Sequence, residues 1–171
     1  MSLQYQQHIP SNFPDEAKTW IYQCNRLFAI QEAFAIEEKI KQFLSEWNTH
    51  GKPNKGWANL FFGQFIVIMA DESSRKLTGC SMDSSIRFIK DLEQTFSVNL
   101  LDRQTLAFII KDKIQLLPLS QLKYAAEHHF IDGDTLYFNN LAATKKELLE
   151  NWIIPIKDSW LAKRLQPLLQ G

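Results

Sequence analysis

One stretch of the sequence combines residue types that could perform chemistry, GCSMDSS at residues 79–85. It stands directly before IRFIKDLEQTF, which has the apolar spacing of an amphipathic helix. A cysteine beside a helix N-terminus can have its pKa lowered by the helix dipole and by unpaired backbone N–H groups. The thiolate that results is a nucleophile at neutral pH, so Cys80 is the first candidate catalytic residue.

Two further residues complete the hypothesis of a thiol site. His50 could act as the base for Cys80, and Asp71 or Asp83 could hold the imidazole in the orientation that this role requires. The candidate ligand-binding residues around them are Asp83, Ser81 and Glu72. If these side chains meet in the fold, they form a small polar site at the start of one helix.

A structural role for Cys80 is the competing interpretation, and we favour it. Asp83, Ser81 or Ser84 can cap the helix, and Cys80 can fill a small apolar space beneath it. Burial and the neighbouring Asp83 both oppose a thiolate, and His50 is mostly neutral at pH 7. We therefore expect Cys80 to be mostly buried and to remain a thiol.

We expect no metal ion and no cofactor. A metal site would have to use His50, Asp71 and Glu72, or the adjacent pair His128 and His129. Neighbouring histidines on a helix point about 100° apart, so they seldom bind one ion. None of these spacings is typical of a zinc or calcium site.

The elements that must position these residues follow from the periodicity of the apolar residues. Strand signals are found at residues 18–25, 57–62, 65–70 and 105–111, and helical spacing at 30–47 and 82–96. The resulting order is the β-α-β-β-α-β pattern of a ferredoxin-like sandwich. We predict an α+β protein with a flexible N-terminal tail at residues 1–16 and this ferredoxin-like core at residues 17–111.

Residues 112–171 are predicted to form a C-terminal extension of a hairpin, a helix, a strand and a helix. In the strand 65–70 both alternating sets of side chains are apolar, which is typical of a strand covered on both faces. The two helices of the sandwich would cover only one face. We therefore expect the extension, or a second subunit, to pack on the other face of the sheet.

The same topology predicts where the loops meet. The loops at residues 49–56 and 71–80 should share one edge of the sheet, which would bring His50 and Cys80 to the same side. Cys24 follows the first strand and should lie at the opposite edge.

Five segments carry a resemblance to a known family: WIYQCNRLF, WNTHG, FIVIMADE, GCSMDSSIRFIKDLEQTFSVNLLDR and DTLYFNNLAATKKELLENWIIPIKDSW. In this order they resemble a small bacterial family, found mainly in Bacteroidetes, whose members sometimes carry the label "ABC transporter ATPase". The resemblance covers residues 19–160 and implies no activity, ligand or catalytic residues.

That label is not supported by a phosphate-binding loop. The nearest segment is GKPNKGW at residues 51–57, where Trp57 stands in the position that requires lysine. The segment also follows a helix and precedes a strand, so it lacks the helix N-terminus that would bind phosphate. We expect no nucleotide hydrolysis.

Composition narrows the remaining classes of function. The chain has 19 Lys and Arg and 19 Asp and Glu, so it has no basic surface for nucleic acid or an anionic membrane. Two cysteines, without disulfide or zinc spacing, and no signal sequence are typical of a cytoplasmic protein.

We expect a module that binds an unknown protein partner or associates with itself as a homo-oligomer. The alternative is a small thiol-dependent enzyme that uses Cys80 with His50. A third hypothesis is a small-molecule binder at the same edge, which would need a concave pocket there.

Overall fold

The computed structural model describes residues 1–169 and shows a mixed α+β chain with antiparallel sheets. This confirms the prediction of an α+β protein. The chain divides into two compact units, and each contains one of the two larger sheets. The first unit comprises Gln4–Leu101 and Ala142–Leu149, and the second comprises Met1–Leu3, Asp102–Leu141 and the residues from Glu150 on. The boundaries therefore differ from those predicted at residues 17–111 and 112–171.

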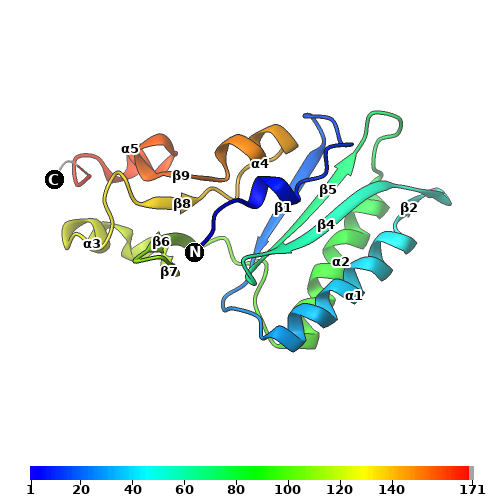
Figure 1. Cartoon of the computed structure of the whole chain (residues 1–171), viewed down its shortest axis with the longest axis horizontal. Helices are drawn as coiled ribbons and strands as arrows, with labels where there is room; N and C mark the ends of the chain where they lie inside the picture. The colour runs from blue at the N-terminus through cyan, green and yellow to red at the C-terminus, as the bar shows by residue number, and fades with distance from the viewer. Residues whose placement is uncertain (170–171) are drawn as a thin grey trace. The chain divides into compact units, whose positions relative to one another are not determined.

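The first unit follows the predicted β-α-β-β-α order, with a small hairpin after its first helix. Its elements are η1 (Tyr5–His8), β1 (Lys18–Gln23), α1 (Ile30–Glu46), β2 (Asn48–Thr49), β3 (Lys52–Pro53), β4 (Lys55–Phe61), β5 (Phe65–Asp71) and α2 (Gly79–Phe96). The start of α4 (Lys145–Asn151) also belongs to it. Strands β1, β5 and β4 form one sheet in this order, and α1 and α2 lie side by side on one of its faces (Figure 1).

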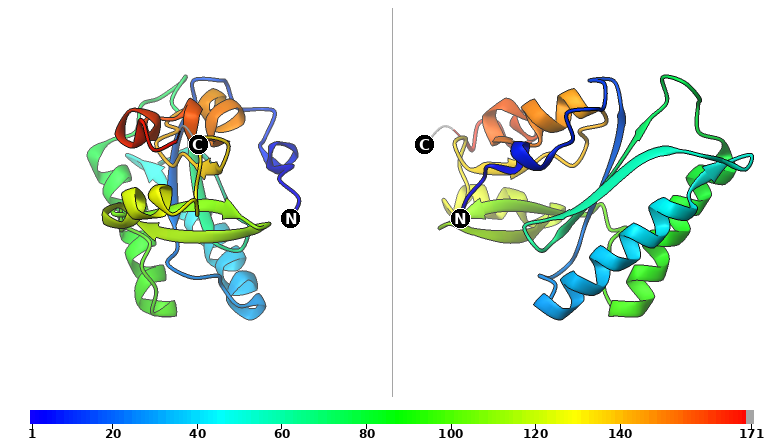
Figure 2. Two further views of the ribbon diagram at one scale, coloured as in Figure 1. Left: turned by 90° about the vertical axis from the view of Figure 1, so that its left-hand side faces the viewer. Right: turned by 45° about the vertical axis from the view of Figure 1, so that its right-hand side comes forward.

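The second unit contains a four-stranded sheet in the order β7-β6-β8-β9. Its elements are β6 (Thr105–Ile110), β7 (Lys113–Pro118), η2 (Leu119–Gln121), α3 (Leu122–Glu127), β8 (Leu136–Phe138), β9 (Ile153–Pro155), η3 (Ile156–Asp158) and α5 (Leu161–Leu165). Its core is formed by apolar residues of β6, β8 and the two helices, with Phe108, Leu122 and Leu161 fully buried. Figure 2 shows β6 and β7 as a long hairpin.

The fourth strand of the predicted sandwich is not part of the first sheet. Residues 105–110 form β6, which pairs with β7 on one side and with β8 on the other. The outer edge of β1 is occupied by the chain before α4. Thr19 donates its backbone N–H to Ala143, and Lys18 pairs with Thr144 as an isolated bridge. A complete ferredoxin-like sheet is therefore not seen in the described residues.

Strand β5 is buried on both faces, as the two apolar sets of its side chains predicted. Ile66 and Val67, which point to opposite faces, are both 0% exposed. One face packs against α1 and α2 through Ile66, Ile68 and Ala70. The opposite face carries Phe61 of β4, because Phe61 pairs directly with Phe65.

The N-terminal segment reaches this opposite face, which corrects the prediction of a flexible tail. The ring of Tyr5 lies 6.5 Å from the ring of Phe61, and its hydroxyl donates to the carbonyl of Leu148 over 2.8 Å. The buried ammonium of Lys145 donates to the carbonyl of Phe13 over 2.7 Å. Segment 1–16 is mostly polar, but its aromatic residues Tyr5 and Phe13 are buried, and the average composition of the segment does not indicate this.

Replacement of Tyr5 will measure how firmly this segment is attached. We expect Tyr5→Ala to lower the free energy of unfolding by about 3 kcal/mol, because it removes a buried aromatic side chain. Tyr5→Phe should lower it by about 1 kcal/mol, because it keeps the ring and removes only the hydrogen bonding of the hydroxyl to the carbonyls of Leu148 and Leu149. Urea unfolding followed by circular dichroism gives both values, and Gln6→Ala, at an exposed position of η1, is the control. Equal stability of all four proteins would support a loose tail.

Candidate functional site

The polar candidate residues lie at the start of α2, as predicted, but the residue that caps the helix is not one of them. Thr78 is the N-cap, and its hydroxyl accepts from the backbone N–H of Ser81 over 3.3 Å. Asp83 and Ser84 do not cap the helix. The predicted caps, Ser81, Asp83 and Ser84, all lie within the helix, because α2 already begins at Gly79.

Ser81 joins α2 to the β2–β3 hairpin, which follows α1. The hydroxyl of Ser81, which is buried, donates to the carbonyl of Asn48 over 2.8 Å and lies 2.8 Å from the hydroxyl of Thr49. The indole of Trp47 donates to the carbonyl of Ser81 over 2.9 Å. These bonds confirm that the two loops meet at one edge, and they give Ser81 a structural role.

Cys80 is exposed, so the prediction that it is buried was wrong. The inward positions of α2 are Ser81, Ser85, Ile89 and Leu92, and Cys80 lies about 100° away from Ser81 around the helix. Met82 and Ile86, whose apolar side chains suggested a different buried face, are 43% and 37% exposed. Both inward serines have acceptors for their hydroxyls: Ser81 donates to the carbonyl of Asn48, and Ser85 donates to the carbonyl of Met82 in its own helix.

His50 does not join Cys80 in a catalytic arrangement. It lies exposed in the turn between β2 and β3 with a positive φ of 52°. In the described part of the chain, no hydrogen bond links it to Cys80, Asp71 or Asp83. The structure therefore brings together the loops that carry the thiol candidates without pairing a base with the thiol.

The two acidic candidates of this edge are already engaged by other residues. Asp71 accepts from the hydroxyl and the N–H of Ser73 and from Lys55, and these bonds lower its pKa to about 2. Burial acts to raise the pKa of Glu72, but its ion pair with Lys18 and the N–H of Leu77 leave it lowered. Both carboxylates hold strand ends and the following loop in place.

Cys24 lies at the opposite end of α2, as predicted. Asn25 and Asn99, which follows α2, bond to each other through backbone and side chain. The 18-residue helix between the two ends spans about 27 Å. Cys24 is 0% exposed, and burial raises the pKa of its thiol.

Metal-ligating residues are not gathered anywhere in residues 1–169, where no group of three or more His, Cys, Asp or Glu could hold an ion. The ring of His128 lies 4.1 Å from the ring of Tyr124 instead of facing His129. His129 has a positive φ of 59° just after α3.

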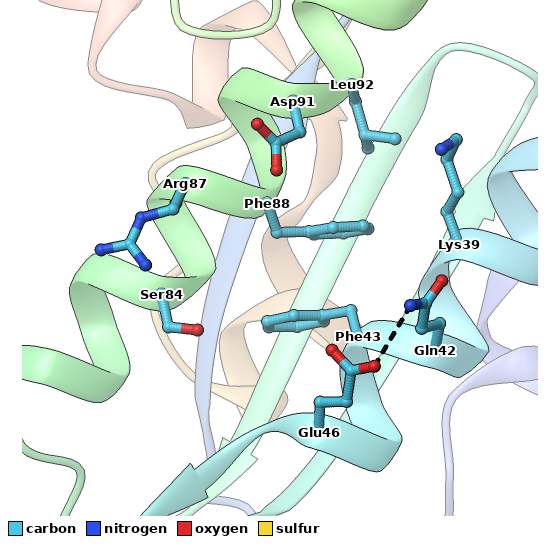
Figure 3. A pocket seen from close by; sticks show the side chains of 9 residues that line it. All are labelled: Lys39, Gln42, Phe43, Glu46, Ser84, Arg87, Phe88, Asp91 and Leu92. Atoms are coloured by element: carbon cyan, nitrogen blue, oxygen red, sulfur yellow. Dashed lines mark hydrogen bonds between the residues drawn. The ribbon is translucent and has the colours of Figure 1, made fainter.

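A shallow pocket lies between α1 and α2, and Figure 3 shows its lining. Its base is formed by the rings of Phe43 and Phe88, which stack 4.4 Å apart and join the two helices. Charged side chains of both signs surround it: Lys39, Glu46, Arg87 and Asp91. Its volume of about 240 Å³ is below the ~300–1,000 Å³ of typical ligand sites.

The second unit contains a larger groove that the sequence did not reveal, named here the β7–α3 groove. It has a volume of about 610 Å³ and is lined by Ile110, Lys111, Lys113, Gln115, Leu117, Gln121, Tyr124, Ala125 and Phe130. Tyr124 and Phe130, on and just after α3, are 59% and 61% exposed. The sequence held one indication of this groove. Lys113, Gln115 and Leu117 alternate along β7, so they share the face that lines the groove.

Comparisons of the chain with protein-family models, with curated proteins and with solved structures gave no match. Among the described helices, none is long and apolar enough to cross a membrane.

The two thiols should differ strongly in their reaction with a maleimide at pH 7. Cys80 is exposed and should react within minutes, whereas Cys24 should react only on unfolding, because it is buried and its raised pKa reduces the thiolate fraction. Mass spectrometry of the Cys24→Ser and Cys80→Ser variants assigns each rate. Rapid labelling of Cys24 in the folded Cys80→Ser variant would contradict the structure.

The hydroxyl of Ser81 should contribute measurably to stability. We expect Ser81→Ala to lower the free energy of unfolding by about 1–3 kcal/mol, because it leaves the carbonyl of Asn48 without this donor. Urea unfolding measures the change. Ser84→Ala, on the same helix but only partly buried, should have little effect. Equal effects of both substitutions would show that the bonds between the loop and α2 do not stabilise the fold.

Proposed function

We propose that this protein is a protein-binding module that holds a peptide segment of a partner in the β7–α3 groove. The exposure of Tyr124 and Phe130 beside a groove of about 610 Å³ carries this proposal. Large aromatic side chains supply much of the affinity of protein interfaces when a partner covers them. Both lie at the wall of a concavity, where a partner's side chain can contact each ring.

The charges of the groove favour an acidic partner segment. Lys111 and Lys113 line one end of the groove, and no carboxylate belongs to its lining. Neither lysine forms an ion pair within residues 1–169. Asp112, which stands between them in the turn, is exposed and does not line the groove. An anionic group on the partner would therefore meet two cations there.

Binding is supported better than thiol catalysis. The lining of the β7–α3 groove contains no Cys, Ser, His or carboxylate that could serve as a nucleophile or as its base. At the other candidate site, Cys80 is exposed but has no base within hydrogen-bond reach in the described residues. A nucleophile without a positioned base lacks the arrangement that acyl transfer needs.

Selection of displayed random dodecapeptides against the full-length protein tests the proposal. We expect enriched peptides to bind in fluorescence anisotropy with an affinity that falls at least tenfold in Tyr124→Ala and Phe130→Ala. Leu141→Ala is the matched control, because Leu141 is 66% exposed in the same unit and does not line the groove. Absence of enrichment, or equal binding by all variants, would contradict the proposal.

A further inference from the structure

Strand β7 is an edge strand whose outer side has no partner within the described chain. It pairs only with β6, in the order β7-β6-β8-β9. The turn between the two strands is Lys111–Asp112, with positive φ values of 51° and 60°. In such a two-residue hairpin the flanking pair, Ile110 and Lys113, exchanges both backbone hydrogen bonds. Ile114 and Leu116 therefore direct their N–H and C=O groups outward.

The outer edge of β1 in the first unit shows how an edge can be closed. Thr19 donates to the carbonyl of Ala143 there, and its hydroxyl donates to the carbonyl of Ala142. Nothing comparable covers β7 in residues 1–169. The open edge ends at Pro118, which has no N–H.

The open edge and the β7–α3 groove belong to one surface. Lys113, Gln115 and Leu117 point into the groove, whereas the alternate residues Ile114 and Leu116 carry the outward backbone groups. A strand added beside β7 would place every second side chain on the same face as these three residues. The side chains of the added strand would then face the other wall of the groove, which is formed by Tyr124 on α3 and by Phe130 just beyond this helix.

From this arrangement we infer that the partner segment binds as an extended strand, antiparallel to β7, with an acidic residue at its C-terminal end. This inference rests on the proposed function and adds the binding mode and the chemistry of the ligand. Peptides commonly bind open sheet edges in this way, with main-chain hydrogen bonds for affinity and side-chain pockets for specificity. The antiparallel direction gives the more stable pairing.

The register follows from the face that lines the groove. In an antiparallel strand, successive peptide positions one, three and five stand opposite Leu117, Gln115 and Lys113. The first two contact the apolar wall, so they should be apolar. The fifth lies beside Lys113 and Lys111, so it should be acidic. The expected pattern is apolar, any residue, apolar, any residue, acidic.

A blocked peptide containing Val-Thr-Val-Thr-Glu, with a fluorophore at its N-terminus, is the probe. We expect saturable binding to the full-length protein in fluorescence anisotropy. Lys113→Glu should weaken it at least tenfold, and a peptide with lysine in place of the glutamate should bind this variant better than the wild type. Lys123→Glu is the matched control, because Lys123 is 76% exposed on α3 and does not line the groove.

N-methylation of the probe tests strand addition without changing the protein. Positions two and four stand opposite Leu116 and Ile114, so their N–H groups face β7 in the inferred register. A methyl group on either nitrogen should reduce binding at least tenfold. Methylation at position three, whose N–H faces away from β7, should leave the affinity nearly unchanged.

The outcomes separate this inference from the proposed function. If selected peptides bind in a Phe130-dependent way but tolerate methylation at every position, strand addition is wrong and peptide binding stands. If neither the probe nor any selected peptide binds, both fail. A further outcome is a dimer in sedimentation that Leu116→Pro dissociates, because proline removes the outward N–H. The occupant of the edge would then be a second copy of this chain, which would overturn the inferred partner segment.

Discussion

The pairing of β6 with β7 through the two-residue turn Lys111–Asp112 is the constraint on which the rest of the structure depends. A local hairpin forms with little loss of chain entropy, so it competes well against a distant strand partner. Once β8 takes the other side of β6, that strand is central in its own sheet. The chain then has two units, and β7 is left as an edge strand of the second sheet.

Local patterns predicted much of the first unit but not the partners of its elements. Two helices, the order of helices and strands along the first unit and the burial of β5 on both faces follow from periodicity, which the sequence shows directly. Residues 105–110 could have paired either with the first sheet or with β7. The apolar content of this strand is the same in both pairings, so the sequence pattern did not distinguish them. The N-terminal segment was misjudged because a few buried aromatics, Tyr5 and Phe13, outweigh many polar neighbours.

The candidate sites show the same limit. The β2–β3 hairpin and the start of α2 meet as the topology required, yet a phase difference of one residue turned Cys80 outward and Ser81 inward. The residue at which a helix begins decides which side chains of its first turn point inward. The sequence contains several residues that could cap α2, so it did not fix this start. The β7–α3 groove could not be predicted, because it arises from the space that a short helix leaves uncovered on a sheet.

Ala142–Leu149, the last segment of the first unit, is synthesised after β6, β7 and β8 of the second unit. Tyr5 bonds to Leu148 across 143 residues of chain, and Ala142–Leu149 belongs to the same unit as the N-terminal segment. A chain emerging from the ribosome has made β5 and both long helices well before this segment exists. The outer edge of β1 and the hydroxyl of Tyr5 must therefore wait for partners that follow β6, β7 and β8, so the two units are interleaved in time as well as in sequence.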